Sequence, residues 1–539
     1  MAATHHSSLS RKFCTEFEKC RRGALLIAIV GIGLTGNICN SQETFKIPYP
    51  TLSKEATVLT EPLDDDGFVD YIAVLNGEAA EGVTPENNFE VVVREVMGDR
   101  NLEGIAEAYY HLLGVTQSPN PEAKFISLDD FLQEKFPNPQ QERERQEQIE
   151  TFSKLWDKPW SGEEFPLFEE LLKRNERALE IVVEGSKRTR NFSPLVSPEN
   201  APQELRLMAA RLPSMNERRA IVQIFLLRAT RKLNGGDPEG SWADLETIHR
   251  IARLTTQTKS QIEWLAGIGF DSSALKSELI VLRHASFNST RLRELAAALE
   301  SLTPFRDPES VVDQYERYQY LEAMTKCYCL PERLKSLTNR SPAAKAQTHR
   351  LLKTSVLDKQ LKWGNRQFDE LVKICRIKDS VKRTEASDQF TQVFEGSLKK
   401  RKENAFFEYI TVSSADSWGL TVRNLVYTQT VPSLLFVGAS QRQATRKGMT
   451  TLAFLLEAYR SDRGEYPENL SQLVPEYVEK LPLDECSGKP FHFTKVGKGC
   501  LLVSFGLNQR DESVTVKPDD SLPNPTGDDI AIELQSTSR

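Results

Sequence analysis

A short apolar stripe near residue 455 constrains the fold more than any other feature of the chain. Leu452, Leu455, Leu456 and Tyr459 recur at the spacing of one face of an α-helix, and Gly464 follows at a position typical of a helix end. A helix with such a stripe is stable only when the stripe is buried against a partner. The sequence therefore predicts an amphipathic helix that ends at Gly464 and packs on the elements that follow it.

Two segments after this helix alternate between apolar and polar residues. Residues 491–494 and 500–505 have the period of β-strands, and the glycines at 497 and 499 are typical of a hairpin turn between them. A hairpin centred on Gly497 and Lys498 pairs Lys495 with Cys500. We therefore expect a helix packed on a small antiparallel sheet.

Prolines mark two further boundaries in this part of the chain. Pro467 suits the first position of a short second helix, whose apolar residues at 470–474 would face the first helix. The apolar residues 431–439 are too few to span a bilayer. We expect them to form the buried first half of the long helix, with Pro432 near its start.

Five motifs occur in this stretch at short intervals. They are Asp462-Arg463-Gly464-Glu465-Tyr466-Pro467, Leu473-Val474-Pro475-Glu476-Tyr477, Leu481-Pro482-Leu483-Asp484, Ser487-Gly488-Lys489-Pro490 and Ser504-Phe505-Gly506. Together they resemble the globular head of the type II secretion major pseudopilins, which are small extracytoplasmic domains carried by a membrane helix. The resemblance implies a pseudopilin-like domain with an acidic tail at residues 430–539, which we call the head.

The same resemblance implies a calcium site after the last strand of the head. The candidate ligands are Asn508, Asp511, Asp528 and Asp529, whose oxygen atoms are of the type that calcium prefers. However, residues 512–518 contain glutamate, valine and proline where the family usually has glycine and aspartate. A solvated acidic tail is therefore the interpretation that we favour, and calcium is the alternative.

The first 40 residues indicate export. Basic residues at positions 11–22 precede an apolar segment, residues 23–39, which is intermediate in length between a signal sequence and a membrane helix. A cleaved signal and an uncleaved anchor are both compatible with it. We favour the anchor, because residues 34–38 make a poor cleavage site. The chain would then cross the inner membrane once, with the bulk of it, from about residue 41, outside the cytoplasm.

The signal that directs pseudopilins into filaments is absent from this segment. Gly23 is followed by Ala24 rather than an aromatic residue, and Ala28 stands where a glutamate would be required. Assembly into a filament by that route is therefore not expected, although the head resembles a pseudopilin.

The region between the apolar segment and the head is expected to be helical. We divide the chain into a basic segment at 1–22, a membrane segment at 23–39, helical regions at 60–200, 201–340 and 341–429, and the head at 430–539. The region 201–340 is weakly similar to tetratricopeptide arrays, because a Gly-Asp turn at 235–237 separates two apolar helical stripes. The predicted fold class is mainly α, with a small α+β C-terminal domain.

The order of these segments is also similar to that in a set of bacterial envelope proteins. Residues 75–88 and 242–253 carry this second resemblance, which implies no activity.

Charge and motifs exclude some functions and leave others open. The net charge of −7, from 69 basic and 76 acidic residues, gives no basic footprint for nucleic acid. The sequence lacks the zinc, nucleophile-elbow and phosphate-loop motifs of common enzymes. Each of the seven histidines is expected to be an ordinary buried or exposed residue.

Two cysteines of the head could form a disulfide. Cys486 and Cys500 would share an oxidising compartment, but Cys486 must fold back to reach its partner, so free thiols are favoured.

These observations favour a membrane-anchored, extracytoplasmic structural or protein-interaction component of the bacterial envelope. An exported enzyme with an unrecognised active site in the helical region is the alternative. A role in a secretion assembly is a third hypothesis, which the absent processing signal argues against.

Overall fold

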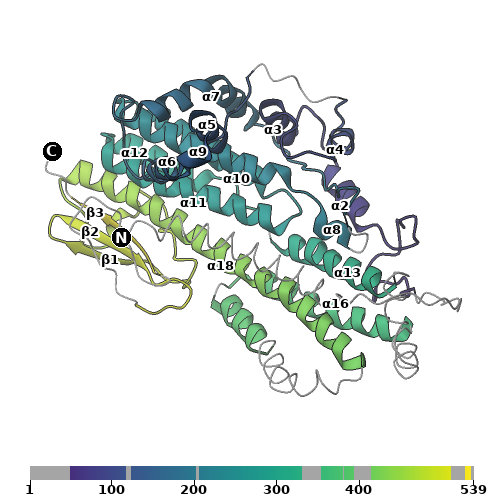
Figure 1. Cartoon of the computed structure of the whole chain (residues 1–539). Coiled ribbons are helices and arrows are strands. Elements are labelled where there is room, and N and C mark those ends of the chain that lie inside the picture. Colours follow the sequence, from purple (N-terminus) through teal and green to yellow (C-terminus); the bar gives the residue numbers. More distant parts are fainter. Residues whose placement is uncertain are drawn as a thin grey trace, which may run out of the picture.

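The computed structural model describes residues 49–116, 123–201, 205–306, 308–329, 354–379, 381–393, 414–511 and 529–535. The basic segment 1–22, the apolar segment 23–39 and the candidate calcium ligand Asp528 lie outside these ranges. The described chain is mainly helical and ends in one small sheet, as the sequence predicted (Figure 1).

The first part of the chain forms short helices. They are α2 (Tyr71–Ala80), α3 (Phe89–Met97), α4 (Ala106–Leu113), α5 (Leu128–Lys135), α6 (Glu142–Lys154) and α7 (Pro166–Gly185). Short polar side chains cap the starts of α3 and α5: the Asn88 side chain accepts a hydrogen bond from the amide of Glu90 at 3.1 Å, and Ser127 accepts one from the amide of Asp130 at 3.2 Å. These hydrogen bonds set the residues at which the two helices begin.

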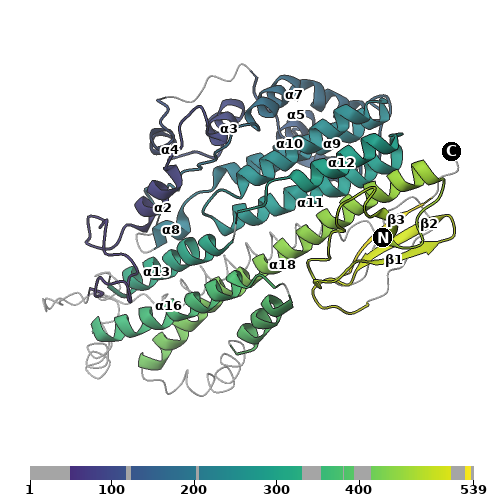
Figure 2. The ribbon, with the colours of Figure 1, turned by 180° about the vertical axis from the view of Figure 1, so that it is seen from behind.

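Longer helices follow and pack in sequence order. They are α8 (Arg206–Ala209), α9 (Pro213–Asn234), α10 (Pro238–Thr255), α11 (Gln261–His284) and α12 (Ser289–Ser301). The predicted break between α9 and α10 is present: Gly236 has a φ of 78°, and Asp237 caps α10 by accepting a hydrogen bond from the amide of Gly240 at 2.8 Å. Helices α9, α10 and α11 therefore lie side by side as consecutive hairpins (Figure 2).

Three further elements extend the molecule away from this array. They are the π-helical turn η3 (Val311–Glu316), α13 (Arg317–Cys329) and α16 (Thr354–Arg376). They pack with α18 (Ser414–Arg463), a helix of 50 residues that is about 75 Å long at the usual rise per residue. The prediction that Pro432 lies near the start of this helix was wrong, because α18 begins at Ser414. None of the helices in the described part of the chain is long and apolar enough to cross a membrane.

The sheet of the head has three antiparallel strands in the order β1 (His492–Val496), β2 (Gly499–Ser504) and β3 (Ile530–Leu534). The predicted register is confirmed, since Lys495 pairs with Cys500. Strand β3, which pairs Leu534 with Cys500, was not predicted.

The predicted end of the long helix is confirmed, but the helix expected at Pro467 is not present. Gly464 follows the last residue of α18 with a φ of 84°. In place of a helix beginning at Pro467, the chain makes a single 3₁₀ turn, η4 (Leu470–Leu473). Leu470 and Leu473 are buried as expected, whereas Val474 is exposed.

The head shares its hydrophobic core with the helical array. Helix α18 lies between the sheet on one side and α11 and α12 on the other (Figures 1 and 2). Phe454 of α18 meets Trp242 of α10 edge to face, with ring centroids 5.5 Å apart. The apolar stripe that the sequence predicted is therefore buried on both sides, and the head packs as part of the helical body.

Truncation of Phe454 to alanine should lower the free energy of unfolding by about 3–5 kcal/mol, because it opens a cavity in this shared core. Urea unfolding followed by tryptophan fluorescence and by circular dichroism should show one transition that shifts as a whole. Leu483→Ala, at an exposed position in the head, is the control and should change stability little. Two transitions, with only one shifted, would show that the head unfolds separately.

Candidate functional site: a buried charged network and a small cavity

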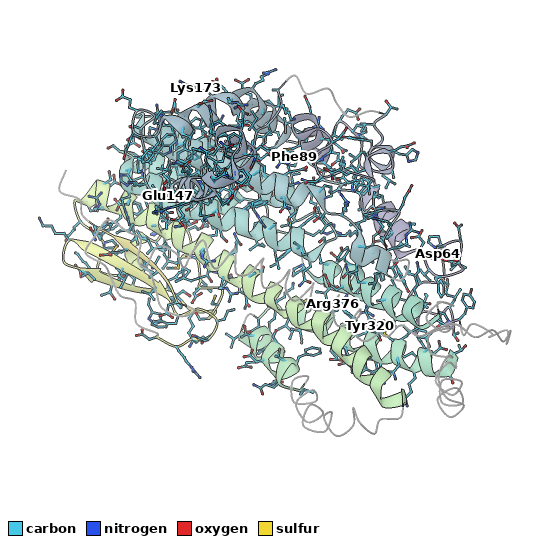
Figure 3. The ribbon with its side chains drawn as sticks, viewed as in Figure 1. Asp64, Phe89, Glu147, Lys173, Tyr320 and Arg376 are labelled. Carbon is cyan, nitrogen blue, oxygen red and sulfur yellow. The ribbon has the colours of Figure 1, made fainter. Side chains whose placement is uncertain are left out.

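Charged side chains from three helices meet in the interior of the helical body. They are Glu90 and Arg94 of α3, Glu217 and Arg218 of α9, and Glu263 of α11, and each is at most 2% exposed. Phe89, the residue before Glu90, is labelled in Figure 3. Charged groups are rarely buried so completely unless they are paired.

The two arginines lie among the three glutamates. Arg218 Nη2 donates to Glu90 Oε2 at 2.6 Å, and its Nη1 lies 3.6 Å from Glu263 Oε1. Arg94 Nε lies 3.0 Å from Glu90 Oε1, and the same guanidinium pairs with Glu217. Glu90 is therefore the central carboxylate, because it contacts both arginines.

Neutral groups complete the surroundings of Glu90. The hydroxyl of Tyr109 on α4 donates to Glu90 Oε1 at 2.9 Å and lies 3.0 Å from Ser193 Oγ. The hydroxyl of Ser214 also donates to Glu90. Burial raises the pKa of Tyr109 far above its usual value, so this side chain stays a neutral donor. The network thus joins α3, α4, α9, α11 and the loop at residue 193.

Glu263 lies beside a small cavity. Burial raises the pKa of Glu263 to about 7, against the attraction of Arg218. Asn191, Ser193 and Lys259 also line the cavity, whose volume of about 10 Å³ suits a single water molecule. The site combines a carboxyl group that titrates near neutral pH with space for a water but not for an organic substrate.

A second buried cluster joins the array to the head. His249 of α10 places Nδ1 2.5 Å from Asp271 Oδ1 and Nε2 2.8 Å from Glu278 Oε1, both on α11. Arg253 donates to Asp271 Oδ1 at 2.6 Å, and Gln443 of α18 donates to the other oxygen of Asp271. We call these five residues the junction, because they connect α10, α11 and α18.

The imidazole of the junction is held in its charged form. Burial alone would lower the pKa of His249, but the charges of Asp271 and Glu278 raise it to about 9. Burial alone would also raise the pKa of Asp271, yet His249 and Arg253 lower it to about 2. Both ring nitrogens therefore donate to carboxylates, which makes the junction a buried ion cluster.

A larger surface groove, of about 620 Å³, lies between α3 and α7. Two of the arginines that line it already have structural partners. Arg228 binds Asp244 through two hydrogen bonds of 2.9 and 2.6 Å, and Arg188 donates to the backbone oxygens of Pro85 and Asn88. These contacts favour a structural role for these two arginines, so we place the candidate site in the interior.

The candidate calcium ligands are described in part. Asn508 and Asp511 follow β2, and the buried Asp529 directly precedes β3. The side chain of Asn508 accepts a hydrogen bond from the amide of Arg510 at 2.8 Å. Within the described ranges, no group of three or more His, Cys, Asp or Glu side chains is placed to hold a metal ion.

Cys486 and Cys500 are buried, and no disulfide joins them, as favoured from the sequence. The amide of Cys486 and the hydroxyl of Ser504 both donate to Asp484, each at 2.9 Å, whereas Cys500 lies four residues away from Ser504 along β2. Four residues of strand measure about 13 Å, which exceeds the reach of a disulfide.

Sequence reasoning missed both buried clusters. His249 was expected to be an ordinary buried or exposed histidine; it is buried with its hydrogen bonds satisfied, and it also belongs to a charged cluster. The available signals were Glu90 and Arg94, four residues apart on the mostly apolar helix α3, and Asp271 and Glu278, seven residues apart on α11. Comparison with models of protein families, with curated proteins and with solved structures finds no match to this chain.

Proposed function

We propose that the chain is a membrane-anchored structural or protein-interaction component of the bacterial envelope, with its pseudopilin-like head outside the cytoplasm. Anchorage through residues 23–39 rests on the basic and apolar pattern of the N-terminus. The observation that carries the proposal is the shared core of the head and the helical body, which supports a role in which the body holds the head in place.

The elements that lie at the two ends of α18 favour this role. The sheet lies at one end of α18, and α16 packs near the other end (Figure 1). The chain that leaves the predicted anchor is attached to α16: the amide and hydroxyl of Thr51 donate to Asp358 at 2.9 and 2.6 Å, and Lys362 binds Glu55 at 2.5 Å. A helix of about 75 Å would therefore hold the head away from the anchored end.

The alternative function, an exported enzyme, is favoured by one observation. Glu263 combines a pKa of about 7 with nearby serine and lysine side chains, as in many sites of general acid and base catalysis. The water-sized cavity argues against it, so we place it second. A calcium ion at Asn508, Asp511, Asp528 and Asp529 belongs to the pseudopilin-like interpretation and would strengthen the head.

Cell fractionation tests the anchorage on which the proposal depends. The full chain should stay in the membrane pellet after alkaline carbonate extraction, with an intact N-terminus by mass spectrometry. The double variant Val30→Arg/Ile32→Arg should leave the pellet, because each central arginine costs about 2.5–3.5 kcal/mol of insertion. The control, Val30→Leu/Ile32→Leu, should behave as the unaltered chain does. Recovery of the unaltered chain in the soluble fraction would contradict the proposal.

A further inference from the structure

Three large apolar side chains are exposed near the start of the described chain. Tyr49 is 44% exposed, Leu52 36% and Leu63 46%. The Tyr49 ring stacks on Phe68 with centroids 5.2 Å apart, and its hydroxyl donates to the backbone oxygen of Asp66 at 3.2 Å. Tyr49 thus packs on the turn that carries Leu63, and we call Tyr49, Leu52 and Leu63 the end patch.

The end patch is attached to the body of the protein. Thr51, which lies between Tyr49 and Leu52, is bound to Asp358 of α16, and Thr354 of the same helix donates to the backbone oxygen of Tyr49 at 3.0 Å. Asn365 donates to the backbone oxygens of Glu55 and Ala56 at 2.9 and 3.0 Å. The patch therefore keeps its position relative to α16, at the end of the molecule away from the sheet (Figure 2).

Chain length limits how far this patch lies from the predicted anchor. Only residues 40–48 separate the apolar segment from Tyr49. A fully extended chain of that length reaches about 34 Å, which is less than half the length of α18. An anchored chain therefore has its end patch close to the membrane surface, whereas the head can stand well away from it.

The chemistry of the patch suits the boundary between lipid head groups and acyl chains. Tyrosine is enriched at this boundary because its ring is apolar and its hydroxyl is polar, and leucine adds apolar area. The neighbouring charges are mainly negative, since Glu61, Asp65 and Asp66 outnumber Lys54. Attraction to anionic lipid does not explain contact here, so the contact has to come from apolar insertion.

We infer that Tyr49, Leu52 and Leu63 form a lipid-contact surface that rests in the head-group layer of the bilayer and orients the body on its anchor. This inference rests on the anchorage proposed above. The expected lipid is zwitterionic, because the acidic neighbours of the patch disfavour an anionic surface.

Site-specific photo-cross-linking tests the contact in the full chain. A benzophenone amino acid is placed at Leu52 or Leu63, and at Val474 or Leu483 as controls, which are 38% and 41% exposed in the head. The purified chain is reconstituted in phosphatidylcholine vesicles, irradiated and analysed by mass spectrometry for lipid adducts. Adducts at 52 and 63 should exceed those at 474 and 483 at least fivefold. All four positions are exposed, so the replacements should leave the fold intact.

The other outcomes separate this inference from the function on which it rests. Equal adducts at all four positions, in a chain that resists carbonate extraction, would overturn the lipid contact and leave the anchorage standing. Cross-links from 52 and 63 to a second copy of the chain would overturn it in favour of self-association. A chain that does not stay with the vesicles would overturn the anchorage and the lipid contact together.

Discussion

Replacing Glu90 by glutamine should lower the free energy of unfolding by about 3–5 kcal/mol, because it leaves two buried arginines without their central carboxylate. Such a loss is a large part of the 5–15 kcal/mol by which domains are usually stable. Urea unfolding should show a lower midpoint with an unchanged slope. Glu107→Gln, at an exposed position on α4, is the matched control and should change stability by less than about 0.5 kcal/mol.

A milder variant keeps this test informative if Glu90→Gln does not fold. Tyr109→Phe removes only the hydroxyl that donates to Glu90, and it should cost about 1–3 kcal/mol. A change below about 0.5 kcal/mol in both variants would contradict a dry, paired network and would indicate that water reaches Glu90 in solution.

Stability should fall as the pH rises from about 6.5 to 9, because the folded chain holds the proton of His249 more tightly than the unfolded chain does. The pKa of His249 is about 9 in the fold and 6.5 without it. The stabilisation is therefore complete below pH 6.5 and is lost as the pH rises through 9. This difference between the pKa of His249 in the folded chain and in the unfolded chain corresponds to about 3 kcal/mol in the free energy of unfolding.

Urea unfolding at pH 6 and pH 9.5 measures this effect, and His249→Gln isolates it. Glu263 also binds its proton more tightly in the folded chain, because its pKa is raised from 4.5 to about 7. Its contribution to stability is therefore lost as the pH rises from 4.5 to 7. His249→Gln should lower stability at pH 6 and flatten its dependence above pH 6.5. His111→Gln, at an exposed position on α4, should keep the dependence. An equal pH dependence in the unaltered chain and in His249→Gln would contradict the assignment to the junction.

The groups around His249 explain why the effect should be seen across the whole molecule. Asp271 and Glu278 face it from α11, and Arg253 from its own helix. Helix α18 contributes Gln443 and Lys447, and the pKa of Lys447 is lowered by burial and by Arg253. Loss of the proton would leave Asp271 and Glu278 with less compensation, and it would weaken the attachment of α18 to the array.

Local features of the chain were predicted well. The end of α18 at Gly464, the pairing of Lys495 with Cys500 and the turn at 235–237 each depend on residues that are close in sequence. Strand β3 was missed because 25 residues separate it from β2 in the sequence, so no turn signal connects them. The start of α18 was misplaced because Pro432 suggested a boundary, although the helix continues through it.

The network around Glu90 and the junction could not be predicted, because most of their ion pairs and hydrogen bonds join residues that are far apart in the sequence. Glu90 and Arg218 are 128 positions apart, and Asp271 and Gln443 are 172 apart. A charged residue on a helix is usually solvated, and only the packing of that helix shows whether its charge is buried.

The mainly helical class of this protein and the hairpin of its head follow from the amino-acid sequence, because caps, turns and apolar periodicity act over a few residues. The core that the head shares with the helical array, and the meeting of five charged side chains around Glu90, are set by the packing of the folded chain. Those features depend on which helix faces pack together, and that choice is made by the free energy of the whole core rather than by any local segment.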